Sequence, residues 1–117
     1  VGGGIQEEDG VPQSISSFLS RHGVDGRSAL GQTALHVAAN VGSLKGTVMV
    51  IDHGADVDEK DPGGWTALHY AAAAGNHLIA TLLMERDAAI LPDKRRRTPL
   101  HLAAHRGSAP ALFALLS

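Results

Sequence analysis

The sequence contains no cysteine, which excludes a disulfide framework, a thiol nucleophile and a cysteine-based zinc site. Aromatic residues are scarce as well, with one Trp, one Tyr and two Phe among 117 residues. An apolar core therefore has to be built from Ala, Leu, Val and Ile, and side chains of this size suit thin layers of closely packed helices.

Strong charge imbalance and long apolar runs are also missing. The net charge is -2, which does not indicate a general binder of polyanions. No apolar run approaches the roughly 18 residues of a membrane span, and no signal peptide is apparent. We therefore expect no membrane partner and an intracellular location, cytoplasmic or nuclear.

A hexapeptide that recurs at a nearly fixed interval is the strongest pattern in the chain. It stands at residues 33–38 (TALHVA), 66–71 (TALHYA) and 98–103 (TPLHLA), so its threonines are 33 and 32 residues apart. Nine residues after each threonine comes a glycine that fits a tight turn between antiparallel helices: Gly42, Gly75 and Gly107. A period of this length is typical of stacked repeats, each of which buries its apolar face against its neighbours.

The hexapeptide resembles the T-P-L-H-x-A signature of the ankyrin repeat. Residues 54–56 (GAD) are similar to the G-A-D that ends the second helix of that repeat, and residues 61–66 (DPGGWT) to its D-x-x-G-x-T hairpin tip. The resemblance covers residues 28–117. It implies an all-α ankyrin-repeat solenoid, in which antiparallel helix pairs are joined by β-hairpin loops.

The resemblance also suggests how the chain is divided. We predict a flexible, acidic and Gly-rich tail at residues 1–12, followed by the ankyrin-repeat domain at residues 13–117. The domain would consist of a partial repeat, two repeats and an incomplete C-terminal repeat, at residues 13–27, 28–60, 61–92 and 93–117.

Several positions depart from the ankyrin pattern, and two of them bear on the backbone of a helix or its end. Gly46 lies inside an expected helix, where it costs about 1 kcal/mol relative to Ala. Asp87 replaces the glycine that normally ends the second helix, so we expect it to adopt the left-handed backbone conformation.

The repeated histidines His36, His69 and His101 raise the question of a metal site. Equivalent atoms in adjacent repeats lie on the order of 10 Å apart, whereas zinc needs all its ligands about 2.1 Å from one centre. By resemblance to the family, each imidazole bonds the backbone of a neighbouring hairpin. We therefore expect structural histidines, no metal and no cofactor.

No catalytic arrangement is apparent in the sequence. Nucleophilic catalysis needs Ser or Thr held against a base and an orienting acid, but the serines cluster in the tail and turns and the regular histidines are assigned to the scaffold. A Gly-rich phosphate loop is also missing. We expect a protein that is not an enzyme and has no small-molecule substrate.

Trp65 is a candidate for partner contact. It precedes Thr66 at the junction of hairpin and helix, where ankyrin side chains commonly face the partner, and tryptophan is enriched among interface hot spots. The alternative is that its ring lies over Pro62 or the adjacent hairpin.

The run Lys94-Arg95-Arg96-Arg97 is the only strong charge run. The resemblance places Lys94, Arg95 and Arg97 at a variable fingertip, and His105 and Arg106 at the variable end of the following helix. In the ankyrin family these positions line one concave face, which would here suit an acidic segment. The alternatives are a solvated surface and a short basic nuclear-localisation signal.

The preceding hairpin is acidic. The family pattern assigns Asp56 and Asp61 to hairpin backbone bonds, which leaves Asp58 and Glu59 as a free acidic tip. Together with Gln32 and Asn40, these two residues form a secondary set of contacts.

The predicted function is protein–protein interaction through the concave face and hairpin tips, with a partner that carries an acidic segment. One alternative is a structural or regulatory segment of a larger protein that packs against its own chain through Leu112, Phe113 and Leu116. Nucleic-acid association through residues 94–106 is a weaker alternative. A protein partner is therefore expected in preference to a nucleic acid.

Overall fold

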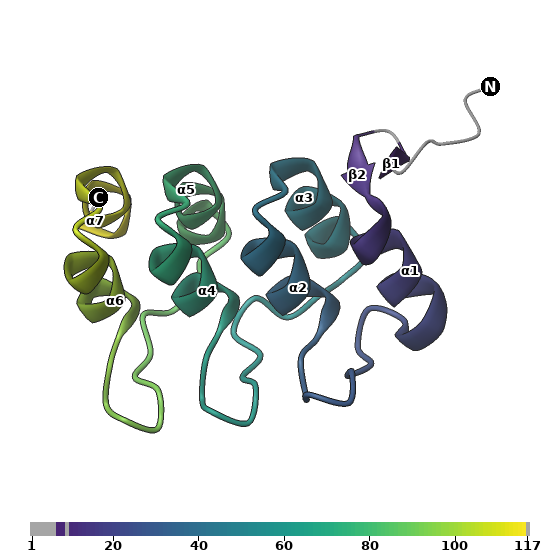
Figure 1. Cartoon of the computed structure of the whole chain (residues 1–117), viewed down its shortest axis with the longest axis horizontal. Helices are drawn as coiled ribbons and strands as arrows, with labels where there is room; N and C mark the ends of the chain where they lie inside the picture. The colour runs from purple at the N-terminus through teal and green to yellow at the C-terminus, as the bar shows by residue number, and fades with distance from the viewer. Residues whose placement is uncertain (1–6, 9, 117) are drawn as a thin grey trace.

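Seven helices and two short strands make up the part of the chain that the computed structural model describes, residues 7–8 and 10–116. The helices are α1 (Gln13–His22), α2 (Ala34–Val41), α3 (Leu44–Asp52), α4 (Ala67–Ala74), α5 (His77–Glu85), α6 (Pro99–Arg106) and α7 (Ala109–Leu116). The pairs α2/α3, α4/α5 and α6/α7 stack side by side along an axis 44 Å long, with α1 at one end (Figure 1). The predicted solenoid of antiparallel helix pairs is thus confirmed.

The first helix of each pair begins and ends where the repeated motif predicts. Thr33, Thr66 and Thr98 are the N-caps, and the backbone N–H of each donates to Nδ1 of the histidine three residues later at 2.9–3.0 Å. This bond satisfies a donor that the helix leaves unpaired. Each helix stops at a glycine with a left-handed backbone, namely Gly42, Gly75 and Gly107. The turn geometry is therefore encoded locally.

The core is built from small aliphatic side chains. Fully buried Leu35, Leu68 and Leu83 alternate with alanines that allow the helices to approach closely, such as Ala38 and Ala71. Phe18 is the one aromatic residue in the buried core of the described residues. Each pair buries its apolar side against its neighbour, as expected for a stacked repeat.

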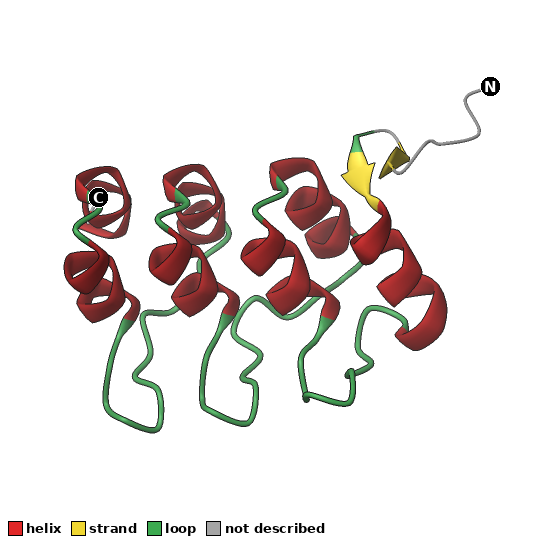
Figure 2. Ribbon diagram, in the orientation of Figure 1, coloured by secondary structure: helices red, strands yellow, loops and turns green. Residues whose placement is uncertain are grey.

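Three hairpin-shaped loops project from the same side of the stack (Figure 2). We name their tips by the backbone bond that closes each one: the first tip is residues 28–32, the second 61–65 and the third 93–97. The closing bonds run from the first N–H of each tip to its last C=O, at 2.9, 2.9 and 2.8 Å. The strands of the described residues are β1 (Glu7–Glu8) and β2 (Val11–Pro12), so the hairpins are closed turns without strands of their own.

Ordered structure begins earlier than predicted. Within the flexible tail predicted at residues 1–12, residues 1–6 and 9 lie outside the described part of the chain, but β1 and β2 pair as an antiparallel ribbon. Val11 is 4% exposed and belongs to the hydrophobic core, so the end of this segment packs on the helices. The tail at residues 1–12 stays a prediction. The repeat boundaries inside residues 13–117 stay a prediction.

Gly46 has a packing role that the sequence did not show. A Cβ at Gly46 would lie 2.4 Å from Cδ1 of Ile15, which is fully buried in α1. The glycine therefore provides the space in which the Ile15 side chain packs against α3.

Two residues other than glycine have a left-handed backbone among the described residues. Asp87, with φ 64°, ends its helix as expected. Arg96, with φ 65°, was not expected there: it occupies the position that Gly31 and Gly64 hold in the other two tips. The third tip thus carries a strained arginine where the others carry glycine.

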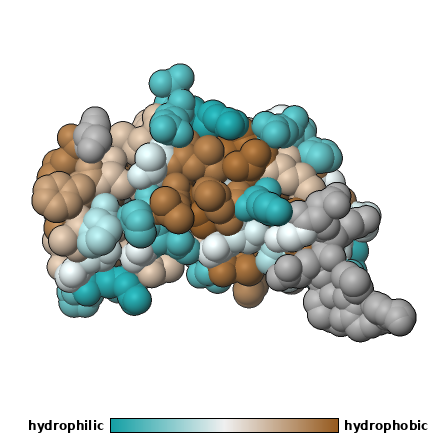
Figure 3. Space-filling model, turned by 90° about the horizontal axis from the view of Figure 1, so that it is seen from above, coloured by the Kyte–Doolittle hydropathy of each residue, from teal (hydrophilic) through white to brown (hydrophobic). Residues whose placement is uncertain are grey.

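Apolar side chains remain exposed on the side of the second helices. Seen from that side, hydrophobic residues form a patch across the middle of the stack (Figure 3). The exposed large apolar residues of the second helices are Leu44 on α3, Leu78 on α5, and Phe113 and Leu116 on α7. Within the described residues, no helix combines the length and apolar character needed to cross a bilayer.

Candidate partner-binding surface

Two of the repeated histidines lock neighbouring hairpins to the helices. Nδ1 of His36 accepts the Thr33 N–H, so the ring proton sits on Nε2, which donates to the carbonyls of Glu59 at 2.9 Å and Trp65 at 3.0 Å. His69 makes the same bond to the carbonyl of Arg97 at 2.9 Å. Burial lowers the pKa of both rings below the ordinary value, and the backbone bonds oppose it only in part. Both rings are therefore structural, as predicted.

His101 has a different environment. Its Nδ1 bonds Thr98, but across the described residues its Nε2 makes no hydrogen bond. The described residues also contain no group of three His, Cys, Asp or Glu side chains placed to hold a metal. The structure thus provides a hairpin bond for two of the three histidines.

One side chain at the start of each tip fixes its shape. The side-chain oxygens of Ser28, Asp61 and Asp93 each accept the backbone N–H groups two and four residues later, at 2.8–3.4 Å. Asp93 was not identified from the sequence, although it precedes Thr98 by five residues, as Asp61 precedes Thr66. That spacing was the signal that could have found it.

Asp93 is the most heavily hydrogen-bonded carboxylate of the surface. It is 6% exposed, and besides two backbone N–H groups it accepts Nε1 of Trp65 at 2.9 Å and Nε of Arg97 at 3.0 Å. Burial acts to raise the pKa of Asp93, but the donors from Arg97, Trp65 and Arg95 outweigh it and hold this pKa well below the usual range. Asp93 is therefore a charged anchor for the third tip.

Trp65 lies in the contact between repeats. Its ring is half-buried, stacks on His69 at 5.7 Å and meets Tyr70 edge-on at 5.0 Å, while the Arg97 guanidinium lies 5.9 Å from its centroid. With its indole N–H on Asp93, Trp65 contacts the adjacent hairpin, which is the alternative that the sequence left open. A contribution to partner binding stays a prediction.

The four basic residues of the third tip divide into two kinds. Arg97 is half-buried and bonded to Asp93, so its guanidinium is directed to the chain itself. Lys94, Arg95 and Arg96 are exposed, and their side chains make no hydrogen bond or ion pair with the described residues. These three cations are available to a partner.

The carboxylates of Asp58 and Glu59, expected to form a free acidic tip, are both engaged between repeats, and their contribution to partner binding stays a prediction. Glu59 forms an ion pair with Arg27 at 2.8 Å, and Arg27 also donates to the carbonyl of Lys60. Asp58 accepts the backbone N–H of Ala89 at 2.8 Å. Both carboxylates are thus paired with groups of a neighbouring repeat.

Gln32 is engaged as well, whereas Asn40 is open to solvent. Nε2 of Gln32 donates to the hydroxyl of Tyr70 at 2.9 Å, and that hydroxyl donates to Oδ2 of Asp61. Burial, followed by the bond to Asp61, raises the pKa of Tyr70 to about 12. Asn40 is exposed on α2, and its side chain makes no hydrogen bond with the described residues.

His105 and Arg106 lie apart from the basic tip. They stand at the C-terminal end of α6, whereas the tip precedes its N-terminal end, and eight helical residues span about 12 Å. Both side chains are exposed, and Arg106 passes close to Gly75 at the end of α4. The five predicted basic contacts therefore form two patches, one at each end of α6.

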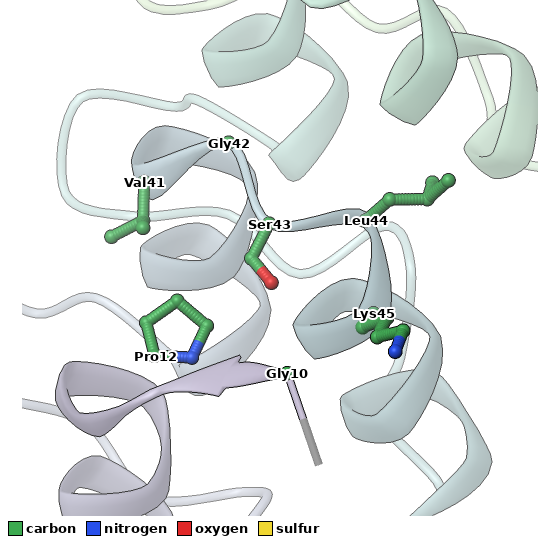
Figure 4. Close-up of a pocket in the computed structure, with 7 residues that line it drawn as sticks. All are labelled: Gly10, Pro12, Val41, Gly42, Ser43, Leu44 and Lys45. Atoms are coloured by element: carbon green, nitrogen blue, oxygen red, sulfur yellow. The ribbon is translucent and has the colours of Figure 1, made fainter. Parts of the chain in front are cut away.

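A hollow elsewhere contains none of the predicted contacts. It has a volume of about 480 Å³ and lies between the N-terminal ribbon and the turn from α2 to α3, where Pro12, Val41 and Lys45 are among the residues that line it (Figure 4). The candidate surface is thus the hairpin side of the stack.

Comparison with known proteins agrees with this architecture. A family model described as ankyrin repeats in three copies matches residues 47–117, and a second, described as ankyrin repeats in many copies, matches residues 22–71. The first match spans more than half of the chain. The protein belongs to the ankyrin-repeat family. Ankyrin repeats are generally non-catalytic modules for protein–protein interaction.

The similar proteins are much longer than this chain. The chain is 38% identical over 77 residues to the inactive serine/threonine-protein kinase TEX14 of Bos taurus, covering 65% of the chain and 5% of that protein. It is 40% identical over 86 residues to the probable E3 ubiquitin-protein ligase XBOS31 of Oryza sativa subsp. japonica, covering 72% and 19%. The human ankyrin and armadillo repeat-containing protein is 34% identical over 91 residues, covering 74% and 6%. The chain therefore corresponds to a small part of each of these relatives.

Proposed function

We propose that this ankyrin-repeat chain binds another protein through the third hairpin tip and the adjoining face of the first helices, and that the contacting segment of the partner is acidic. The observation that carries the proposal is a segregation of charge within the described residues. The hairpin carboxylates are paired inside the chain, whereas three of the four cations of the third tip, Lys94, Arg95 and Arg96, are not.

Four carboxylates illustrate this pairing. Asp58, Glu59, Asp61 and Asp93 each accept bonds from their own or a neighbouring repeat. Against them stand the exposed, unpaired side chains of the third tip, Lys94, Arg95 and Arg96. The tip thus offers positive charge although the whole chain has a net charge of -2. Such a local field favours association with an acidic surface and orients it.

The distance between the two basic patches indicates the form of the partner segment. An extended chain advances about 3.3 Å per residue, so roughly four residues cover the 12 Å length of α6. An acidic segment lying along α6 could reach the tip with one end and Arg106 with the other. Trp65 and Arg97 hold the third tip in place through their hydrogen bonds to Asp93.

The test is capture of the partner by wild-type protein and by the tip variant Lys94→Glu, Arg95→Glu. Both replaced side chains are exposed and unpaired in the described structure, whereas replacing Arg97 would break its bond to Asp93. The control Arg21→Glu, Lys45→Glu changes the charge equally but lies on α1 and α3, outside the third tip.

The expected result is a protein captured by wild type and control and lost from the tip variant. A synthetic peptide of its acidic segment should then compete for binding. Equal capture by all three proteins, equal loss from both variants, or no capture by wild type would contradict the proposal.

A further inference from the structure

A groove of about 270 Å³ opens between the second and third tips. Lys60 and Asp61 lie on one wall, Asp93 and Lys94 on the other, and Pro62 and Pro92 add apolar surface. Both walls come from hairpins of successive repeats, so the groove exists only because the repeats are stacked.

The base of the groove is fixed by bonds between the two hairpins. The backbone N–H of Lys94 donates to the carbonyl of Gly63 at 3.0 Å, and the Trp65 indole bonds Asp93. Gly64 is buried, with a left-handed backbone, and a Cβ there would lie 2.9 Å from the nitrogen of Lys94. A ligand would therefore find a groove that is already formed, which reduces the entropy cost of binding.

The groove is lined by two carboxylates and two ammonium groups, and within the described part of the chain only the ammonium groups are left without a partner. Oδ1 of Asp61 accepts two backbone N–H groups and its Oδ2 accepts the Tyr70 hydroxyl, while Asp93 accepts four donors. The ammonium groups of Lys60 and Lys94, in contrast, have no partner among the described residues. Both carboxylates therefore have hydrogen-bond donors within the chain, whereas the two ammonium groups remain free to bind a ligand.

We propose that this groove is a subsite for one Glu or Asp side chain of a partner protein, whose carboxylate lies between the ammonium groups of Lys60 and Lys94. The inference rests on the proposed function and adds to it a position for one acidic residue and a new contact, Lys60. A single negative charge matches the site better than a doubly charged phosphate, because two carboxylates line its walls. The Trp65 ring is already stacked on His69, meets Tyr70 edge-on and has the Arg97 guanidinium over it, so a stacking nucleobase would have to displace one of these contacts.

The test measures binding of a hexaglutamate peptide at low ionic strength, where charge interactions are least screened. Titration calorimetry gives the affinity, and the fluorescence of Trp65, the chain's one tryptophan, reports on the groove. The variant is Lys60→Gln, which leaves the third tip intact. The matched control is Lys45→Gln, a lysine exposed on α3.

We expect Lys60→Gln to weaken the binding of the peptide about three- to fivefold, whereas Lys45→Gln should leave the affinity for the peptide unchanged. Equal weakening by both variants would overturn the subsite, since it would reflect net charge alone. Tighter binding of inorganic phosphate or a thymidine hexanucleotide than of the peptide would overturn it as well.

The two proposals fail in different ways. If Lys60→Gln binds the peptide like wild type while Lys94→Glu, Arg95→Glu does not, the carboxylate subsite is wrong. The proposal that the third tip binds an acidic segment is then retained. If neither variant loses affinity, both proposals are wrong.

Discussion

Nε1 of Trp65 donates a hydrogen bond to Oδ2 of Asp93 over 2.9 Å, and this bond joins the start of α4 to the hairpin of the following repeat. Arg97 bonds the same oxygen and lies against the same ring. A residue placed where ankyrin side chains commonly face a partner thus also holds two repeats together. Asp93 therefore connects the stacking of these two repeats to the shape of the third tip.

The first prediction concerns Asp93 itself. Asp93→Asn places an amide where four donors converge, so at least one donor loses its acceptor. We expect the Tm to fall by roughly 5–10 °C, with a change in Trp65 fluorescence in the folded state. Thermal unfolding followed by circular dichroism and fluorescence measures both.

The control for Asp93→Asn is Asp25→Asn, an exposed carboxylate without a bond among the described residues. It should leave the Tm nearly unchanged. An equal fall for both variants would show that loss of negative charge, and not the hydrogen-bond network, determines the effect.

The second prediction compares two adjacent glycines of the second tip. Gly64→Ala forces a Cβ onto a left-handed backbone and within 2.9 Å of the Lys94 nitrogen, so we expect a loss of about 2–4 kcal/mol in unfolding free energy. At Gly63 the nearest atom to a new Cβ is Oδ1 of Asp61 at 3.5 Å. Gly63→Ala should therefore be almost neutral in urea unfolding. Similar losses at both positions would contradict the close contact of the hairpins.

The third prediction is a loss of stability in acid. Burial lowers the pKa of His36 and His69 in the folded state below 6.5, so the unfolded chain binds more protons as the pH falls. Their contribution to stability is complete above pH 6.5 and decreases as the pH falls through that value towards the folded-state pKa. Urea unfolding at pH 7.5, 6.5 and 5.5 should give decreasing midpoints. His69→Gln should reduce this dependence; a flat wild-type profile would contradict the assignment.

The features that could be predicted from the sequence are local in the chain. The threonine caps, the histidines three residues later and the glycine turns repeat within each unit, and a single repeat determines their geometry. The left-handed backbone of Asp87 could be predicted for the same reason, since it follows from its position in the repeat. The stack of helix pairs follows because no unit can bury its apolar side alone.

The site could be predicted only in part, because its pairing involves distant residues. Asp58, Glu59 and Gln32 bond partners 31, 32 and 38 residues away, and sequence alone does not show which carboxylate is used inside the stack. The burial of Val11 and the space that Gly46 leaves for Ile15 were missed for the same reason. Asp93 could have been found, because its position relative to Thr98 repeats that of Asp61.

The fourth prediction reverses an ordinary rule for helices. Replacing a glycine inside a helix by alanine normally stabilises it by about 1 kcal/mol, but a Cβ at Gly46 would lie 2.4 Å from Ile15 Cδ1. Gly46→Ala should therefore destabilise the protein by about 1–2 kcal/mol. Adding Ile15→Val, which removes that methyl group, should recover part of the loss. A double-mutant cycle of urea unfolding measures the coupling, and purely additive effects would contradict the contact.

The fifth prediction concerns the strained arginine of the third tip. Arg96 has a φ of 65° where the equivalent residues are glycines, and a left-handed backbone is costly for a side chain of this kind. Arg96→Gly should therefore raise the unfolding free energy by about 0.5–1 kcal/mol. Because its cation is exposed and unpaired in the described structure, the same change should weaken hexaglutamate binding about twofold.

The matched control for Arg96→Gly is Asp87→Gly, at the other left-handed residue among those described. Aspartate tolerates this conformation better than arginine, so Asp87→Gly should stabilise the protein less. It should also leave peptide binding unchanged, because Asp87 lies at the end of α5 and not in a tip. If Arg96→Gly alone is more stable and binds the peptide more weakly, the charge of Arg96 contributes to binding at a cost in backbone strain. Lower stability of Arg96→Gly would show that the arginine supports the hairpin, and unchanged binding would remove it from the recognition surface.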